Sequence, residues 1–109
     1  MFGERQINLQ LTERANDFIE RNKVKSGLQS PILGLGWGTF SKESEERWSI
    51  GFYGRKDVRE GWLGITPTFE FVVIQEWILD AVDNRIMDID HDKGIVTFDP
   101  PVQVEAQKV

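Results

Sequence analysis

The hydrophobic period changes along this chain, and that change limits the fold most. One early segment repeats its apolar residues at helical spacing, whereas later segments alternate apolar and polar residues one by one. Ala15, Phe18 and Ile19 recur at i, i+3 and i+4, which predicts a helix over about residues 12–25. Thr12 provides a good N-cap for it. The remainder of the chain reads mainly as strands.

Five to seven short strands are expected. The strongest signal is TFEFVVI at residues 68–74, which is rich in β-branched and aromatic residues. Trp48, Ile50 and Phe52 lie on one side of an alternating strand over 47–53. Residues from Gln75 to about Val82 predict a short second helix. The other extended segments are 7–11 (a short strand or an extended lead-in), 31–37, and a hairpin of 84–90 with 95–98 that turns at Asp92-Lys93-Gly94.

These elements predict a small α+β domain. Its sheet would be mixed or antiparallel, with one N-terminal helix and one short second helix. The length of 109 residues suits a single domain over 1–109, with a core of about 7–101 and polar tails at both ends. The order of elements lacks the βαβα alternation of nucleotide-binding folds.

Composition narrows the classes of partner. The net charge is −5 and the sequence pI about 4.8, so we expect no nucleic acid as partner, since nucleic-acid binding rests on basic faces. No apolar run approaches the roughly 20 residues that span a bilayer, and we expect no membrane partner either. The opening MFGERQINLQ lacks the apolar region of a signal peptide, which favours a cytoplasmic location.

The chain contains no cysteine. Disulfides, catalytic thiols and thiolate-held metals are therefore impossible within this sequence. The one histidine, His91, falls in the predicted hairpin turn, where we expect an exposed residue. A catalytic Cys–His pair is excluded, and no nucleophile-elbow motif accompanies the histidine. We therefore expect a protein that is not an enzyme and that has no cofactor.

The order of the elements resembles the HesB-like family, the A-type iron–sulfur carriers. The segments that carry the resemblance are INLQLTERANDFIERN (7–22), ILGLGWG (32–38), WSIGFY (48–53), TFEFVVIQEWILD (68–80) and IMDIDHDKGIVTFDPP (86–101). The resemblance implies the fold of that family. It also locates a departure, because the family's three cluster-binding cysteines would fall near residues 36–38 and after the final proline. This chain has glycine, tryptophan and VQVEAQKV there.

Iron–sulfur clusters need soft thiolate ligands, which carboxylates and one imidazole do not replace. The resemblance therefore implies a HesB-like domain without the cluster site. We expect such a domain to act through protein–protein contacts, with a protein partner or as a homodimer. Candidate contact residues are Trp37, Trp62 and Phe40, which lie in or beside loops. Trp37 and Trp62 could equally fill the core, as we expect of Trp48 and Trp77.

Two other patterns in the sequence invite a functional interpretation. Glycines 34, 36 and 38 resemble a dinucleotide fingerprint, but the spacing is one residue short and no helix follows, which favours a bulged strand. Asp88, Asp90, Asp92 and Asp99 occupy positions one, three, five and twelve of a calcium-loop spacing. Lys93 stands where that loop needs glycine, and flanking helices are not predicted. A solvated hairpin face is the competing interpretation.

Carboxylate chemistry provides a further alternative. Asp57, Glu60 and Glu70 could serve a small hydrolase or isomerase. Such enzymes use paired carboxylates in which one acts as acid and the other as base or nucleophile. Nothing in the spacing of these three residues singles them out, so this alternative ranks behind a protein-contact role and behind a calcium-binding module.

The missing thiols lead to a direct prediction. Incubating the purified chain with iron and sulfide under reducing conditions should produce no stable cluster chromophore, because the polypeptide supplies no thiolate ligand for the cluster. Absorbance spectra and iron analysis after desalting make the measurement. Stoichiometric bound iron with a brown colour would contradict it.

Overall fold

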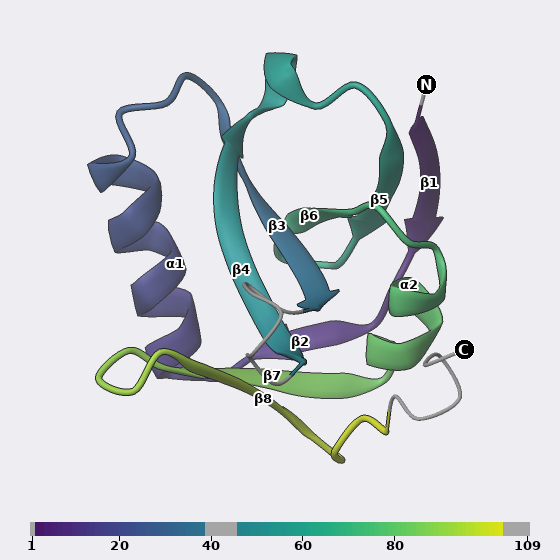
Figure 1. The fold of residues 1–109 in the computed structure, drawn as a ribbon. Helices are drawn as coiled ribbons and strands as arrows, with labels where there is room; N and C mark the ends of the chain where they lie inside the picture. Colours follow the sequence, from purple (N-terminus) through teal and green to yellow (C-terminus); the bar gives the residue numbers. More distant parts are fainter. Residues whose placement is uncertain (1, 39–45, 104–109) are drawn as a thin grey trace.

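The computed structural model describes residues 2–38 and 46–103, which form a two-sheet α+β domain. Figure 1 shows the two helices on opposite sides of the molecule, with strands of the larger sheet between them and the smaller sheet along the bottom. The described strands are β1 (Phe2–Gln6), β2 (Leu9–Leu11), β3 (Pro31–Gly38), β4 (Arg47–Gly54), β5 (Gly61–Ile65), β6 (Glu70–Val73), β7 (Arg85–Asp90) and β8 (Ile95–Asp99); the helices are α1 (Glu13–Lys25) and α2 (Trp77–Val82), with one 3-10 turn over Arg55–Asp57.

Both sheets are mixed. The larger has the order β1-β5-β6-β3-β4, and the smaller has the order β2-β7-β8. Parallel pairing joins β1 to β5, β3 to β6 and β2 to β7, whereas β3–β4, β5–β6 and β7–β8 are antiparallel. The α+β prediction, with one long N-terminal helix and a short second helix, is confirmed.

Helix α1 forms where its sequence signals place it. The Thr12 hydroxyl accepts a hydrogen bond from the Ala15 amide at 3.2 Å, which satisfies one of the unpaired donors at the helix start. Ala15 and Ile19 are fully buried, and Phe18 packs partly against the core. The helix ends at Lys25 with Ser26 as its C-cap, and Gly27 follows in the left-handed conformation that glycine tolerates best.

The predicted hairpin of β7 and β8 is also confirmed. The carboxylate of Asp90, the last residue of β7, accepts hydrogen bonds from the backbone amides of Asp92 (3.1 Å) and Lys93 (3.3 Å). These two bonds stabilise the turn. Gly94 completes the turn with φ +66°, and five residue pairs then align the strands. Met87 and Ile89 of β7 point into the core, and Val96 and Phe98 of β8 do the same.

The core lies between the two sheets and includes side chains from both helices. The inner face of the larger sheet contributes Leu33, Leu35, Trp48, Phe71 and Val73, and α2 contributes Ile78, Leu79 and Val82. The predicted inward face of the β4 strand, with Trp48, Ile50 and Phe52, is confirmed. A smaller cluster of Ile32, Leu63 and Val72 lies on the outer face of the larger sheet.

Three sequence expectations were wrong. Residues 2–6, expected as a polar tail, form β1 and pair with β5 in parallel register from Phe2 opposite Gly61 to Gln6 opposite Ile65. β5 itself had no predicted counterpart, and it brings the described strands to eight. β3 has no bulge, since its register with β4 is unbroken over eight residue pairs.

A close approach inside the sheet gives a stability prediction. A Cβ at Gly64 would lie 2.5 Å from the ring of Phe71 and 3.1 Å from Leu79, and Phe71 is completely buried. Gly64→Ala should therefore lower the free energy of unfolding by about 1–3 kcal/mol, as overpacking does. Denaturant titration measures it. Gly38→Ala is the control, because no described atom lies within 4 Å of that Cβ; equal midpoints for the two variants would contradict the prediction.

Candidate functional site

A groove lies on the outer face of the larger sheet, away from the main core. The register of β3 and β4 sets Gly34 opposite Gly51 and Gly36 opposite Ser49, so the middle of this strand pair carries only glycine and serine on that face. The resulting hollow has a volume of about 470 Å³. Its lining is Gly34, Leu35, Gly36, Ser49, Ile50, Gly51, Tyr53, Asp57, Val58, Arg59, Glu60, Val72 and Ile74.

Two large side chains form walls above this glycine floor. The ring of Tyr53 crosses Gly34, where a Cβ would come within 2.3 Å of the ring, and its hydroxyl lies near Gly51. Ile74 follows β6 and leaves 69% of its surface exposed. A Cβ at Gly36 would meet only the Ser49 hydroxyl, at 3.7 Å. The groove is therefore open above Gly36 and occupied by the tyrosine ring above Gly34.

The rim is the segment 55–60 between β4 and β5. It is anchored by the Arg55 amide, which donates to the Ser30 carbonyl at 3.1 Å, and by an ion pair between the Arg55 guanidinium and Glu70. Val58 packs on the small outer cluster that contains Val72. Backbone and apolar contacts thus fix the rim above the sheet, and the hollow is formed by the fold itself.

Two of the three carboxylates considered for hydrolysis line the groove, and the third pairs with Arg55. Asp57 and Glu60 reach the groove margin, and a Cβ at Gly54 would lie 2.9 Å from the Asp57 carboxylate. Glu70 accepts the Arg55 ion pair. The groove therefore holds two of the three residues, and the third is engaged by a cation.

Trp37 and Trp62, two of the predicted contact residues, lie on the opposite side of the sheet from the groove. Trp37 packs edge-on against Trp48 with ring centroids 5.2 Å apart, and its indole N–H donates to Glu46 at 2.8 Å. Trp62 also packs partly against the main core, on β5, and β6 separates it from the strand of Trp37. The structure does not bring the two indoles together. Phe40 lies outside the described residues.

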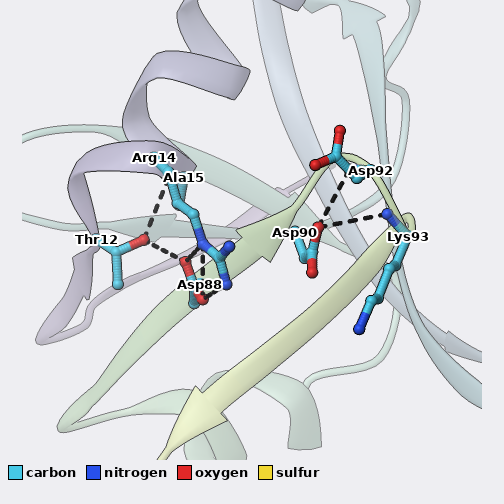
Figure 2. Close-up of polar contacts among 7 residues, drawn as sticks. All are labelled: Thr12, Arg14, Ala15, Asp88, Asp90, Asp92 and Lys93. Atoms are coloured by element: carbon cyan, nitrogen blue, oxygen red, sulfur yellow. Dashed lines mark hydrogen bonds and ion pairs between the residues drawn. The ribbon is translucent and has the colours of Figure 1, made fainter.

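The acidic hairpin uses its carboxylates within the protein (Figure 2). Asp88 accepts hydrogen bonds from Arg14 Nε at 2.8 and 3.0 Å, one to each carboxylate oxygen, and from the Thr12 hydroxyl at 2.6 Å. The Arg14 guanidinium and then the Thr12 hydroxyl hold the pKa of Asp88 well below its usual range. This arrangement ties the start of α1 to the middle of β7.

The other acids of the calcium-like spacing are dispersed. Asp90 closes the turn, Asp92 lies 3.1 Å from the imidazole of the exposed His91, and Asp99 stands opposite Ile86 at the end of the hairpin. Within the described part of the chain, no three His, Asp or Glu side chains converge as a metal site would require. The spacing matched a calcium loop, but the fold places it along a hairpin.

Sequence reasoning overlooked the groove. The glycines of β3 were noticed, yet their meaning depends on alternation: Gly34 and Gly36 fall between the inward residues Leu33 and Leu35, so the glycines share the outer face. On β4, Gly51 and Tyr53 likewise lie on the outer face of the sheet. The alternation of small residues in both strands was the signal in the sequence that could have predicted the groove. The rim and Ile74 come from other parts of the chain, and no sequence pattern connects them to these strands.

Comparisons with known proteins place the chain in no group: no family model matches it, and neither does a curated protein or a solved structure. In residues 2–38 and 46–103, neither helix combines the length and apolar character needed to cross a bilayer. What the structure shows is a two-sheet α+β domain with a glycine-floored groove on its outer face.

From the contacts that Arg14 and Thr12 make with the Asp88 carboxylate, we expect a contribution to stability that is lost in acid. Asp88→Asn should lower the free energy of unfolding by about 1 kcal/mol at neutral pH, a modest value because Arg14 is 57% exposed and solvent screens the pair. A carboxylate whose pKa is lowered on folding stabilises above its ordinary pKa and loses that effect as the pH falls. The difference between parent and variant should therefore shrink below about pH 4.

Urea titrations at several pH values make this measurement. Asp92→Asn is the matched control, since Asp92 is 84% exposed in the same hairpin and should change the unfolding midpoint little. A parent–variant difference for Asp88 that stayed constant through the acid range would contradict the assignment.

Proposed function

We propose that the protein is a non-enzymatic binding module that receives an apolar side chain of a partner protein in the groove on its outer face. The observation that supports this proposal is the glycine-floored hollow of about 470 Å³ between Tyr53 and Ile74. This volume lies in the range of roughly 300–1,000 Å³ that small ligands occupy. Such a volume accommodates a large side chain together with neighbouring backbone.

The walls favour an apolar guest. Ile74 is largely exposed and Tyr53 is 51% exposed, so a guest between them would remove apolar surface from water on both sides. Fully burying one large aliphatic side chain is worth about 1.5–3 kcal/mol. The glycine floor lets a guest approach the backbone closely, as a floor carrying side chains would not.

The non-enzymatic part of the proposal draws on residue chemistry. The chain has one histidine, and it lies in the hairpin turn rather than along the groove. Ser49 and Tyr53 provide hydroxyls in the described lining without an imidazole among the lining residues. A hydroxyl needs an adjacent base to act as a nucleophile near neutral pH. Asp57 and Glu60 also line the groove, and carboxylates can act as bases, so the proposal that a guest is held rather than transformed rests on the apolar walls.

The resemblance to the HesB-like family stays a prediction, as does a cytoplasmic location. The proposal is compatible with that resemblance, because a domain of that family without cysteines would keep its fold and lose its cluster. It does not depend on the family, since it rests on the groove itself; Gly36 of the groove floor lies where the resemblance would place one of the cluster-binding cysteines.

Side-chain surrogates test the proposal. Titrating the isotope-labelled chain with N-acetyl-tryptophanamide or N-acetyl-leucinamide should shift the amide signals of Gly34, Gly36 and Gly51. Gly36→Val fills the hollow and should weaken the binding at least about tenfold. This position tolerates a larger side chain, because only the Ser49 hydroxyl lies near its Cβ.

Gly38→Val is the matched control on the same face of β3. Its Cβ meets no described atom within 4 Å, and it lies outside the groove lining, so binding should be unchanged. Shifts confined to other parts of the chain, or equal binding by both valine variants, would overturn the proposal.

A further inference from the structure

The charges at the groove margin indicate what kind of partner segment the groove receives. We propose that the partner presents its apolar side chain next to a lysine or arginine, so that a positive charge meets the carboxylates of the margin. This inference rests on the function proposed above and adds the chemistry of the partner to it. The observation behind it is that Asp57 and Glu60 line the groove together with one cation, Arg59.

Each wall of the groove has one of these carboxylates beside it. A Cβ on the glycine that follows Tyr53 would lie 2.9 Å from the carboxylate of Asp57. A Cβ on the glycine that follows Glu60 would lie 3.6 Å from Cδ1 of Ile74. An apolar side chain seated between Tyr53 and Ile74 therefore has an acid near it on both sides, and the residue next to it in the partner chain comes to the acidic margin.

The cations of the rim leave this acidity in place. Arg55 is paired with Glu70, and Arg59 already has an interaction within the structure. The two groove carboxylates take part in none of the ion pairs of the described residues. Two carboxylates against one guanidinium give the lining a net charge of −1. The margin therefore attracts a cationic guest and repels an anionic one, and the net charge of −5 on the whole chain acts in the same direction.

The apolar walls suit the same kind of guest. Tyr53 is half exposed, and a tyrosine ring attracts a cation that lies over its face. Lysine and arginine also have long aliphatic stems, which pack on apolar surface while the charged end stays in water. Because a solvent-exposed charge pair contributes little, we expect the apolar side chain to provide most of the affinity and the charge to select among partners.

Three short peptides test this selection. Each has acetylated and amidated ends, and in each a tryptophan is followed by lysine, glutamine or glutamate. Amide signals of the isotope-labelled chain report the binding. At low salt the lysine peptide should bind at least about fivefold more tightly than the glutamate peptide, with the glutamine peptide between them. The difference should shrink in about 1 M sodium chloride, where charges more than about 3 Å apart are screened.

Two double variants separate the groove carboxylates from the charge of the whole chain. Asp57→Asn with Glu60→Gln should remove the preference for lysine over glutamate and keep the affinity for the glutamine peptide, which also shows that the groove is intact. Asp17→Asn with Asp92→Asn removes the same charge from exposed residues outside the lining, so it should keep the preference.

The outcomes distinguish this inference from the proposed function. Equal binding of the three peptides at low salt would overturn the cationic guest and leave the groove as an apolar site. A preference that persists without Asp57 and Glu60, or that disappears in the control variant, would also overturn it, because the charge of the whole chain would then be responsible. Failure of all three peptides to bind would overturn the proposed function, and this inference with it.

Discussion

The indole of Trp48 joins the two sheets, and the remainder of the architecture depends on that contact. Its ring lies 4.9 Å from the ring of Phe98 on the smaller sheet, 5.2 Å from that of Trp37 on the neighbouring strand, and 6.1 Å from that of Trp77 on α2. Edge-on and tilted aromatic pairs add to the free energy gained from burial alone. One side chain of β4 therefore sets how the larger sheet sits against the hairpin and the second helix.

The same strand pair creates the groove by having opposite characters on its two faces. Side chains alternate across a strand, so the large residues that fill the core leave every second position free to be small. In β3 and β4 those positions are Gly34, Gly36, Ser49 and Gly51. The inner face packs into the core, and the outer face leaves the space that forms the groove.

Local signals were enough to predict part of this structure. Thr12 and the apolar stripe of α1 predicted the first helix, and Gly94 with its preceding aspartate predicted the hairpin, because caps and turns depend on neighbours in sequence. The parallel pair of β1 and β5 was missed because its strands come from distant segments and β1 is polar. The role of Asp88 was missed for the same reason, since Arg14 is 74 residues away.

The candidate site could be predicted even less completely. The glycines of β3 were visible, but a groove needs the rim from 55–60 and the wall from Ile74, and only tertiary structure brings these segments together. The tryptophans attracted attention as contact residues because of their neighbouring loops, although Trp37 and Trp62 pack against the core. The residue type indicated a tendency to form apolar contacts, but it did not indicate which face of the sheet each residue occupies.

The attachment of the first helix to a late strand also constrains the order of events during folding. The parallel pairing of β2 with β7, together with the clamp of Arg14 on Asp88, requires the ribosome to have released most of the described chain before α1 finds its lasting neighbours. Until then the helix has only its own turns, and an isolated helix of this length is marginal in water. Topologies dominated by such distant contacts fold slowly. The nascent domain consequently spends its longest interval with the apolar stripe of α1 uncovered, the period in which assistance from a chaperone would matter most.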